Sequence, residues 1–162
     1  MNRSEFKEVI NASREKTWDV LFNQYGDIHI HNPLMTSSSY LNNASRGGLD
    51  CVRHTEFPGK LYLDEKITEV DKNHSFTIVV TEHNLPFVKE MSATYELNSI
   101  EDEVTEVKMT SFNSFSPRFM KYLMRGQSGK SLVKHLFGLK YYIETGKTVN
   151  MENYSEIFNK YK

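Results

Sequence analysis

Six segments between Leu34 and Ser114 alternate apolar and polar residues with the two-residue period of a β-strand. Each is bounded by Gly, Pro, Asn or Asp, which favour turns between strands. The predicted strands cover residues 34–42, 51–57, 61–70, 75–83, 88–98 and 104–114. With a further strand predicted at Phe6–Ala12, the pattern indicates a seven-stranded antiparallel sheet that has one buried and one solvated face.

Helical spacing lies on both sides of these six strands. Ser13 is a predicted N-cap for a short helix with Trp18 and Phe22 on one apolar face, and residues 27–33 form a second short turn. Residues 118–145 are predicted to form one long helix after Pro117. Its core stripe contains Leu132, Leu136, Leu139 and Ile143, and Gly126 and Gly129 are expected to loosen or kink it.

The order of these elements restricts how the sheet can bury its apolar face. Only the final long helix is large enough to cover that face, so the chain is predicted to be an α+β protein. Residues 1–148 form one predicted domain, and residues 149–162 form an amphipathic tail with Met151, Tyr154, Phe158 and Tyr161 at helical spacing. The tail either covers a second side of the long helix or contributes to a homodimer; that side contains Val133, Phe137 and Tyr141.

The composition argues against several classes of binding partner. Lysine and arginine number 20 against 21 acidic residues, with no long block of one sign, so a nucleic-acid partner is not expected. The single cysteine, Cys51, and an N-terminal sequence without the apolar stretch of a signal peptide lead us to expect a cytoplasmic protein. No run approaches the roughly 20 apolar residues of a membrane span, so stable membrane insertion is not expected.

The turn at Pro58 and Gly59 predicts a specific pairing of two strands. A three-residue loop of Pro58, Gly59 and Lys60 places Arg53 directly opposite Glu65. Both side chains share a face with apolar neighbours, so the two charges are expected to meet inside the sheet. Buried charges are costly unless they are paired.

Several short motifs occur in a characteristic order along residues 5–145. They are Ile10–Trp18, His31-Asn-Pro33, Arg53, Glu65 with Asp71, Gly138-Leu-Lys140 and Glu144. In this order and spacing the chain resembles the START-related (SRPBCC) superfamily, which includes polyketide cyclase/dehydrase and lipid-transport proteins, birch-pollen allergens and abscisic-acid receptors. His31 stands where a Trp is usual. The resemblance implies a helix-grip fold, in which a curved seven-stranded sheet with two short helices after its first strand wraps around a long C-terminal helix.

The resemblance also implies an internal cavity. In this superfamily the residues that match Arg53 and Glu65 often line the cavity and orient a polar group on an apolar ligand; the alternative is a salt bridge that braces the hairpin. Polar side-chain atoms on the inward faces of the strands need hydrogen-bond partners, which a ligand or water can supply. The predicted ligand-binding residues are Arg53, Glu65, Leu63, Ile78, Val80, Met91, Ala93, Tyr95, Met109, Ser111, Asn113, Ser128, Leu132 and His135.

Motifs for metals and cofactors are weak. His29 and His31 have no third ligand at a suitable spacing, so no metal site is predicted. Gly126 and Gly129 do not have the spacing of a phosphate-binding loop, and no cofactor is predicted. Cys51 is interpreted as a small buried apolar residue. The loop of residues 82–87 either forms a lid or simply connects two strands, with Leu85 and Phe87 packed on the end of the sheet.

The first functional hypothesis is binding or transport of a small hydrophobic molecule, such as a lipid, a polyketide-like compound or an aromatic metabolite. The second is a cyclase/dehydrase-type enzyme in which Glu65 or His135 moves a proton. The third is a non-catalytic interaction protein with a filled core. The sequence assigns no catalytic residue and leaves both a monomer and a homodimer open.

Overall fold

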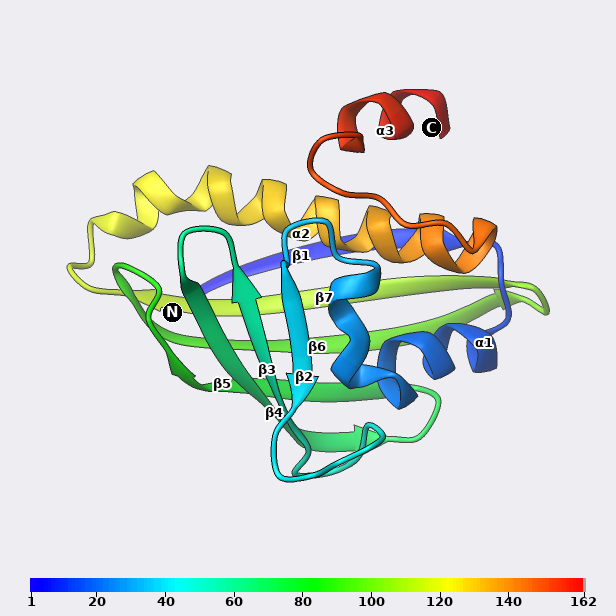
Figure 1. Cartoon of the computed structure of the whole chain (residues 1–162), viewed down its shortest axis with the longest axis horizontal. Helices are drawn as coiled ribbons and strands as arrows, with labels where there is room; N and C mark the ends of the chain where they lie inside the picture. The colour runs from blue at the N-terminus through cyan, green and yellow to red at the C-terminus, as the bar shows by residue number, and fades with distance from the viewer. Residues whose placement is uncertain (162) are drawn as a thin grey trace.

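The computed structural model describes residues 1–161 and shows the predicted α+β helix-grip fold (Figure 1). The strands are β1 (Asn2–Ile10), β2 (Ser37–Tyr40), β3 (Val52–Phe57), β4 (Leu61–Asp71), β5 (Ser75–His83), β6 (Val88–Glu101) and β7 (Val104–Phe115). The helical elements are α1 (Arg14–Trp18), the π-helical turn η1 (Asp19–Asn23), the 3-10 helix η2 (Tyr25–Ile30), α2 (Met120–Thr145) and α3 (Tyr154–Tyr161). The seven strands form one antiparallel sheet in the order β1-β7-β6-β5-β4-β3-β2.

The β3–β4 hairpin has the predicted register. Phe57 pairs with Leu61, and Arg53 pairs with Glu65. Gly59 and Lys60 adopt positive φ angles of 79° and 60° in the turn, which glycine accommodates without strain. The cross-strand meeting of the two charged residues is therefore confirmed.

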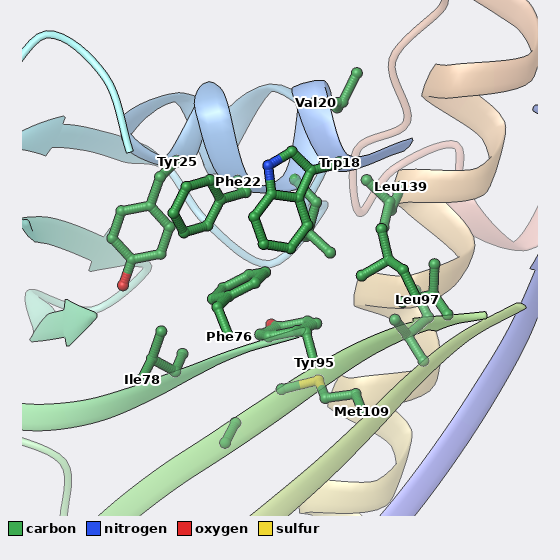
Figure 2. Close-up of a cluster of buried hydrophobic side chains, with 14 of the residues drawn as sticks. Trp18, Val20, Phe22, Tyr25, Phe76, Ile78, Tyr95, Leu97, Met109 and Leu139 are labelled. Atoms are coloured by element: carbon green, nitrogen blue, oxygen red, sulfur yellow. The ribbon is translucent and has the colours of Figure 1, made fainter. Parts of the chain in front are cut away.

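The short helices close one end of the sheet with aromatic side chains (Figure 2). The Ser13 side chain caps α1 by accepting a hydrogen bond from the backbone N–H of Lys16 (3.2 Å), as predicted. The rings of Trp18 and Phe22 stack with centroids 4.4 Å apart, and Phe22 meets the edge of Phe76 at 5.2 Å. This cluster supplies a dense core under the second half of α2.

Helix α2 differs from its prediction in two respects. It begins at Met120 rather than at residue 118, and it runs to Thr145 as one continuous helix through Gly126 and Gly129, where loosening or a kink was expected. Glycine keeps both backbone hydrogen-bonding groups, so it weakens a helix by about 1 kcal/mol without interrupting the hydrogen-bond ladder. The helix ends at Gly146, whose φ of 71° forms a left-handed C-cap.

The second half of α2 lies unusually close to the segment that follows η2. A Cβ atom at Gly138 would lie 2.1 Å from the backbone oxygen of His31 and 2.9 Å from the ring of Pro33. Leu136, Leu139 and Ile143 are buried against the sheet at this level, whereas Leu132 is only partly buried. The absence of a side chain at Gly138 therefore permits the close packing of this half of the helix.

Helix α3 packs on the outer side of α2 (Figure 1). The Phe137 ring contacts Tyr154 and Phe158 with centroid distances of 5.7 and 4.9 Å, and Tyr161 donates a hydrogen bond to Glu144. Of the two expected roles for the tail, the structure shows coverage of this side of α2 within one chain. Across residues 1–161, no helix is both long enough and apolar enough to span a membrane.

Candidate ligand cavity

A cavity of about 490 Å³ lies between the concave face of the sheet and the first half of α2. All fourteen residues that the sequence nominated for ligand binding lie in its wall. Their contact with a ligand stays a prediction. Further wall residues are Ile28, Asn32, Leu34, Met35, Phe57, Pro58, Leu61, Leu85, Pro86, Val88, Ser92, Phe115, Met124, Gln127, Ser131 and Met151.

Some of the missed wall residues had a detectable signal. Leu61 continues the inward alternation of Leu63, and Met124 lies four residues before the nominated Ser128 on α2. Leu34 and Met151 lie outside β2 and α3, although the predicted strand 34–42 and the predicted tail spacing included them, so local periodicity did not show that they face the cavity. Their position in the wall depends on the tertiary fold.

The buried pair of Arg53 and Glu65 forms one part of the wall and also ties η2 to the sheet. Arg53 Nε donates to Glu65 Oε2 at 2.6 Å, and Arg53 Nη1 donates to the backbone oxygen of Tyr25 at 3.1 Å. The guanidinium carbon lies 3.9 Å from the centre of the Tyr25 ring, whose hydroxyl donates to the Glu65 carbonyl. The pair therefore lines the cavity and also braces η2 against the sheet.

Electrostatics keep the Arg53 guanidinium charged. Burial alone would lower the pKa of Arg53, which is only 2% exposed, but the adjacent negative charge of Glu65 raises the pKa overall. Each charge thus has its counter-ion within the protein. A ligand does not need to supply one.

His135 and Tyr95 form a second polar contact deep in the wall. The Tyr95 hydroxyl and His135 Nε2 are 3.0 Å apart, and both residues are buried. Burial, followed by the positive charge of Arg53, lowers the pKa of His135 to about 3, and burial raises the pKa of Tyr95. Both groups are therefore uncharged near neutral pH. His31, whose pKa is also lowered by burial and by His135, stacks beside the His135 ring at 5.9 Å.

The polar residues of β7 satisfy each other only in part. Asn113 Nδ2 donates to Ser111 Oγ at 3.2 Å, and the two residues are buried. The Oδ1 atom of Asn113 and the Nδ1 atom of His135 are buried without a hydrogen-bond partner within the described chain. Such atoms are uncommon in folded proteins and mark this wall as polar at specific points.

The remaining wall is uncharged. Among the described residues that line the cavity, only Arg53 and Glu65 carry a formal charge, and they neutralise each other. The other wall residues are apolar, apart from the uncharged polar groups of Ser, Asn, Gln, Tyr and His. The cavity is thus electroneutral and predominantly apolar.

Of the two histidines considered for a metal site, His29 is hydrogen-bonded to Ser38, whereas the Nδ1 atom of His31 is buried without a hydrogen-bond partner among residues 1–161. His29 Nδ1 lies 2.7 Å from Ser38 Oγ, and His54 Nδ1 lies 2.5 Å from Asp64. Within residues 1–161, no three His, Cys, Asp or Glu side chains lie close enough to hold a metal ion. Burial raises the pKa of Cys51, which matches its interpretation as a buried apolar residue.

The loop between β5 and β6 lies at the open end of the cavity. Leu85 and Pro86 are wall residues, whereas the Phe87 side chain is about half exposed. Both the lid and the plain connection of two strands stay open as predictions for this loop. The exposed wall residues Pro58, Pro86 and Gln127 mark where the cavity reaches the surface.

Comparison with known proteins identifies the fold. No protein-family model and no curated protein matches the chain. Among solved structures, XoxI from Bacillus cereus has a TM-score of 0.71 at 16% identity, covering 88% of this chain and 96% of that chain. A protein from Nitrosospira multiformis has a TM-score of 0.71 at 11% identity, covering 90% and 98%. Ara h 8.0201 has a TM-score of 0.70 at 13% identity, covering 88% and 97%.

These identities are too low to transfer an activity. The structural likeness shows the fold alone, a curved antiparallel sheet around a long C-terminal helix. Fold alone does not define a reaction, so function has to be argued from the cavity itself.

Proposed function

We propose that this protein binds and carries a small, uncharged and largely apolar molecule in the cavity between the sheet and α2. The observation that carries the proposal is the cavity of about 490 Å³. Ligand pockets typically measure roughly 300–1,000 Å³ and combine apolar walls with a few polar groups. An interaction protein with a filled core would not contain an empty volume of this size between its sheet and its long helix.

The charge of the ligand follows from the pairing of Arg53 and Glu65. An ionised ligand group inside the cavity would lie in an apolar environment without a free counter-ion, which is strongly unfavourable. Hydroxyl, carbonyl or amide groups can instead bond to the side chains of Ser111, Ser128 and Gln127 in the wall. Neutral lipids, polyketide-like compounds and uncharged aromatic metabolites meet these requirements.

Catalysis is not part of the proposal. Glu65 is already bonded to Arg53; His135 Nε2 is bonded to Tyr95, and burial lowers the pKa of His135 to about 3, which makes it a weak base near neutral pH. A general acid or base needs access to a substrate proton. The cyclase/dehydrase hypothesis therefore has no observation that favours it over binding.

Two neighbouring valines provide a matched test of the cavity. Val80 lies in the cavity wall, whereas Val79, the preceding residue of β5, is absent from the wall. Val80→Trp should fill part of the cavity and weaken ligand binding at least tenfold, and Val79→Trp should leave binding nearly unchanged. The measurement is native mass spectrometry of the purified protein, followed by titration with a panel of lipids and aromatic compounds. Equal affinities of the two variants would refute a cavity site.

A second test addresses ligand charge. A long-chain alcohol should raise the melting temperature near neutral pH, and the carboxylic acid of the same length should raise it less. Lowering the pH should then improve binding of the acid, because protonation removes the buried charge. If the protein prefers the ionised acid, the proposal that the ligand is uncharged is overturned, but the proposal of a cavity site stands. If it binds neither compound and no compound of the panel, both proposals are overturned.

A further inference from the structure

Four large apolar side chains project into solvent at one end of the molecule. Phe87 is 49% exposed, and Phe119, Tyr122 and Leu123 are 61%, 73% and 69% exposed. We name these four residues the mouth patch. Phe119, Tyr122 and Leu123 lie three and four positions apart, so they share one side of the first turns of α2.

The mouth patch borders the opening of the cavity. The backbone N–H of Ser116 donates to the Phe87 carbonyl at 2.9 Å, which joins the β5–β6 loop to the connection between β7 and α2. Figure 1 shows these two connections at the same end of the sheet. Of the adjacent wall residues, Pro86 lies in the β5–β6 loop, and Met124 and Gln127 lie in the first turns of α2.

Basic side chains are interspersed with the mouth patch. The sequence from residue 107 to residue 143 contains no acidic residue, and Arg118, Lys121 and Arg125 lie within the first turns of α2 or just before them. Lys121 Nζ lies 4.7 Å from the centre of the Tyr122 ring. Within the described chain none of the three forms an ion pair with an acidic side chain, so their charge is available to a partner.

We propose that the mouth patch docks on the surface of a bilayer that contains anionic lipids. Exposed aromatic and aliphatic side chains enter the boundary between headgroups and acyl chains, and basic neighbours are attracted to anionic headgroups. Docking here would place the cavity opening against a source of apolar molecules. The surface contact itself is independent of the ligand proposed above.

Two features favour a bilayer over another protein. A symmetric contact with a second copy would bring Arg118, Lys121 and Arg125 close to the same basic residues of that copy. In addition, the patch side chains protrude and do not line a groove, and a fluid bilayer accepts protruding side chains without a complementary pocket. Charge and shape therefore point to the same partner.

The experiment is sedimentation of the full chain with vesicles of phosphatidylcholine, with and without phosphatidylserine. The wild type should bind the vesicles that contain phosphatidylserine more tightly, and added salt should weaken this binding. Phe119→Ser, Tyr122→Ser and Leu123→Ser combined should lower partitioning about tenfold or more, because the inserted apolar surface is lost. The control is Ile100→Ser, which removes a 54% exposed side chain from the last residues of β6 at the other end of the sheet.

A pair of charge reversals tests the electrostatic part. Arg118→Glu with Arg125→Glu should lower binding to phosphatidylserine vesicles to the level of phosphatidylcholine vesicles. Lys72→Glu with Lys147→Glu changes the net charge equally but away from the patch, and should retain binding. Failure of the wild type to bind either vesicle would overturn the proposal. So would equal losses in patch and control variants, or a wild-type dimer that the patch substitutions abolish.

Discussion

The two halves of α2 have opposite environments. Residues 135–139 are all buried, and Leu139 and Ile143 pack into the main core. From residue 120 to residue 134, by contrast, every side chain is partly or fully exposed. One continuous helix is therefore a core element at its C-terminal half and the roof of a cavity at its N-terminal half.

The residues that face the sheet explain the difference. The C-terminal half presents Leu136 and Leu139 to the aromatic cluster around Trp18 and Phe76 (Figure 2), and α3 covers its other side. The N-terminal half presents Ser128 and other polar residues to the sheet. Polar groups gain little from dry packing unless they find partners, so the helix stands away from the sheet there.

This difference indicates a division of stability and binding within one fold. Substitutions around the closed half should affect unfolding, whereas substitutions around the open half should affect binding with small effects on unfolding. Four changes test this division.

The largest effect is expected from Arg53→Met at the junction of the two halves. The substitution leaves the Glu65 carboxylate buried without its partner, so the free energy of unfolding should fall by about 3–5 kcal/mol. Urea denaturation measures the loss. Arg53→Met combined with Glu65→Leu should recover most of it, because no unpaired charge remains; a double variant as unstable as the single one would contradict a role for charge pairing.

The next effect compares two leucines of α2. Leu139→Ala should cost about 3 kcal/mol, because Leu139 is fully buried in the core. Leu123→Ala should change stability by less than about 0.5 kcal/mol, because Leu123 is exposed at the mouth. Urea midpoints of the two variants provide the comparison. Similar losses at both positions would mean that the first half of α2 carries as much core energy as the second.

The β-hairpin shows what the sequence can define. The alternation around Arg53 and Glu65 identifies their face, and the three-residue turn leaves one register that places them opposite each other. The same alternation predicted the wall residues of β4–β7, because every second residue of a strand points to the same face of the sheet. The face to which a strand residue points depends on the local alternation and does not depend on how the sheet packs against the rest of the protein.

The cavity itself could not be predicted in this way. Inward residues such as Ala93 and Met109 would face either a packed helix or a void, depending on the distance between α2 and the sheet. That distance arises from contacts between remote segments, such as the approach of Gly138 to His31. The helix is continuous through Gly126 and Gly129 for a related reason, since a cost of about 1 kcal/mol per glycine is easily offset by contacts elsewhere along the helix.

A third effect is the pH dependence contributed by His135. Its folded pKa of about 3 lies below the value of about 6.5 for an unfolded histidine, so the unfolded chain binds the proton first. Stability should therefore fall as the pH decreases from about 6.5 toward 3, by about 2 kcal/mol from this residue at pH 5. His135→Gln should flatten the slope in that range, with part of it remaining because burial also lowers the pKa of His31. Urea midpoints between pH 7 and pH 4 measure the slope, and His74→Gln at an exposed position is the control. Identical slopes in wild type and His135→Gln would contradict the assignment.

The smallest effect has the opposite sign and separates the two halves of α2 most directly. A Cβ at Gly126 would meet no atom within 4 Å, so Gly126→Ala should stabilise the protein by about 0.5–1 kcal/mol through helix propensity alone. The same change at Gly138 would place a Cβ 2.1 Å from the His31 carbonyl oxygen and should be strongly destabilising. Thermal melts of the two variants should therefore shift in opposite directions. If Gly126→Ala instead destabilises the protein, the first half of α2 requires the backbone flexibility of glycine, which a regular, solvent-exposed helix does not need.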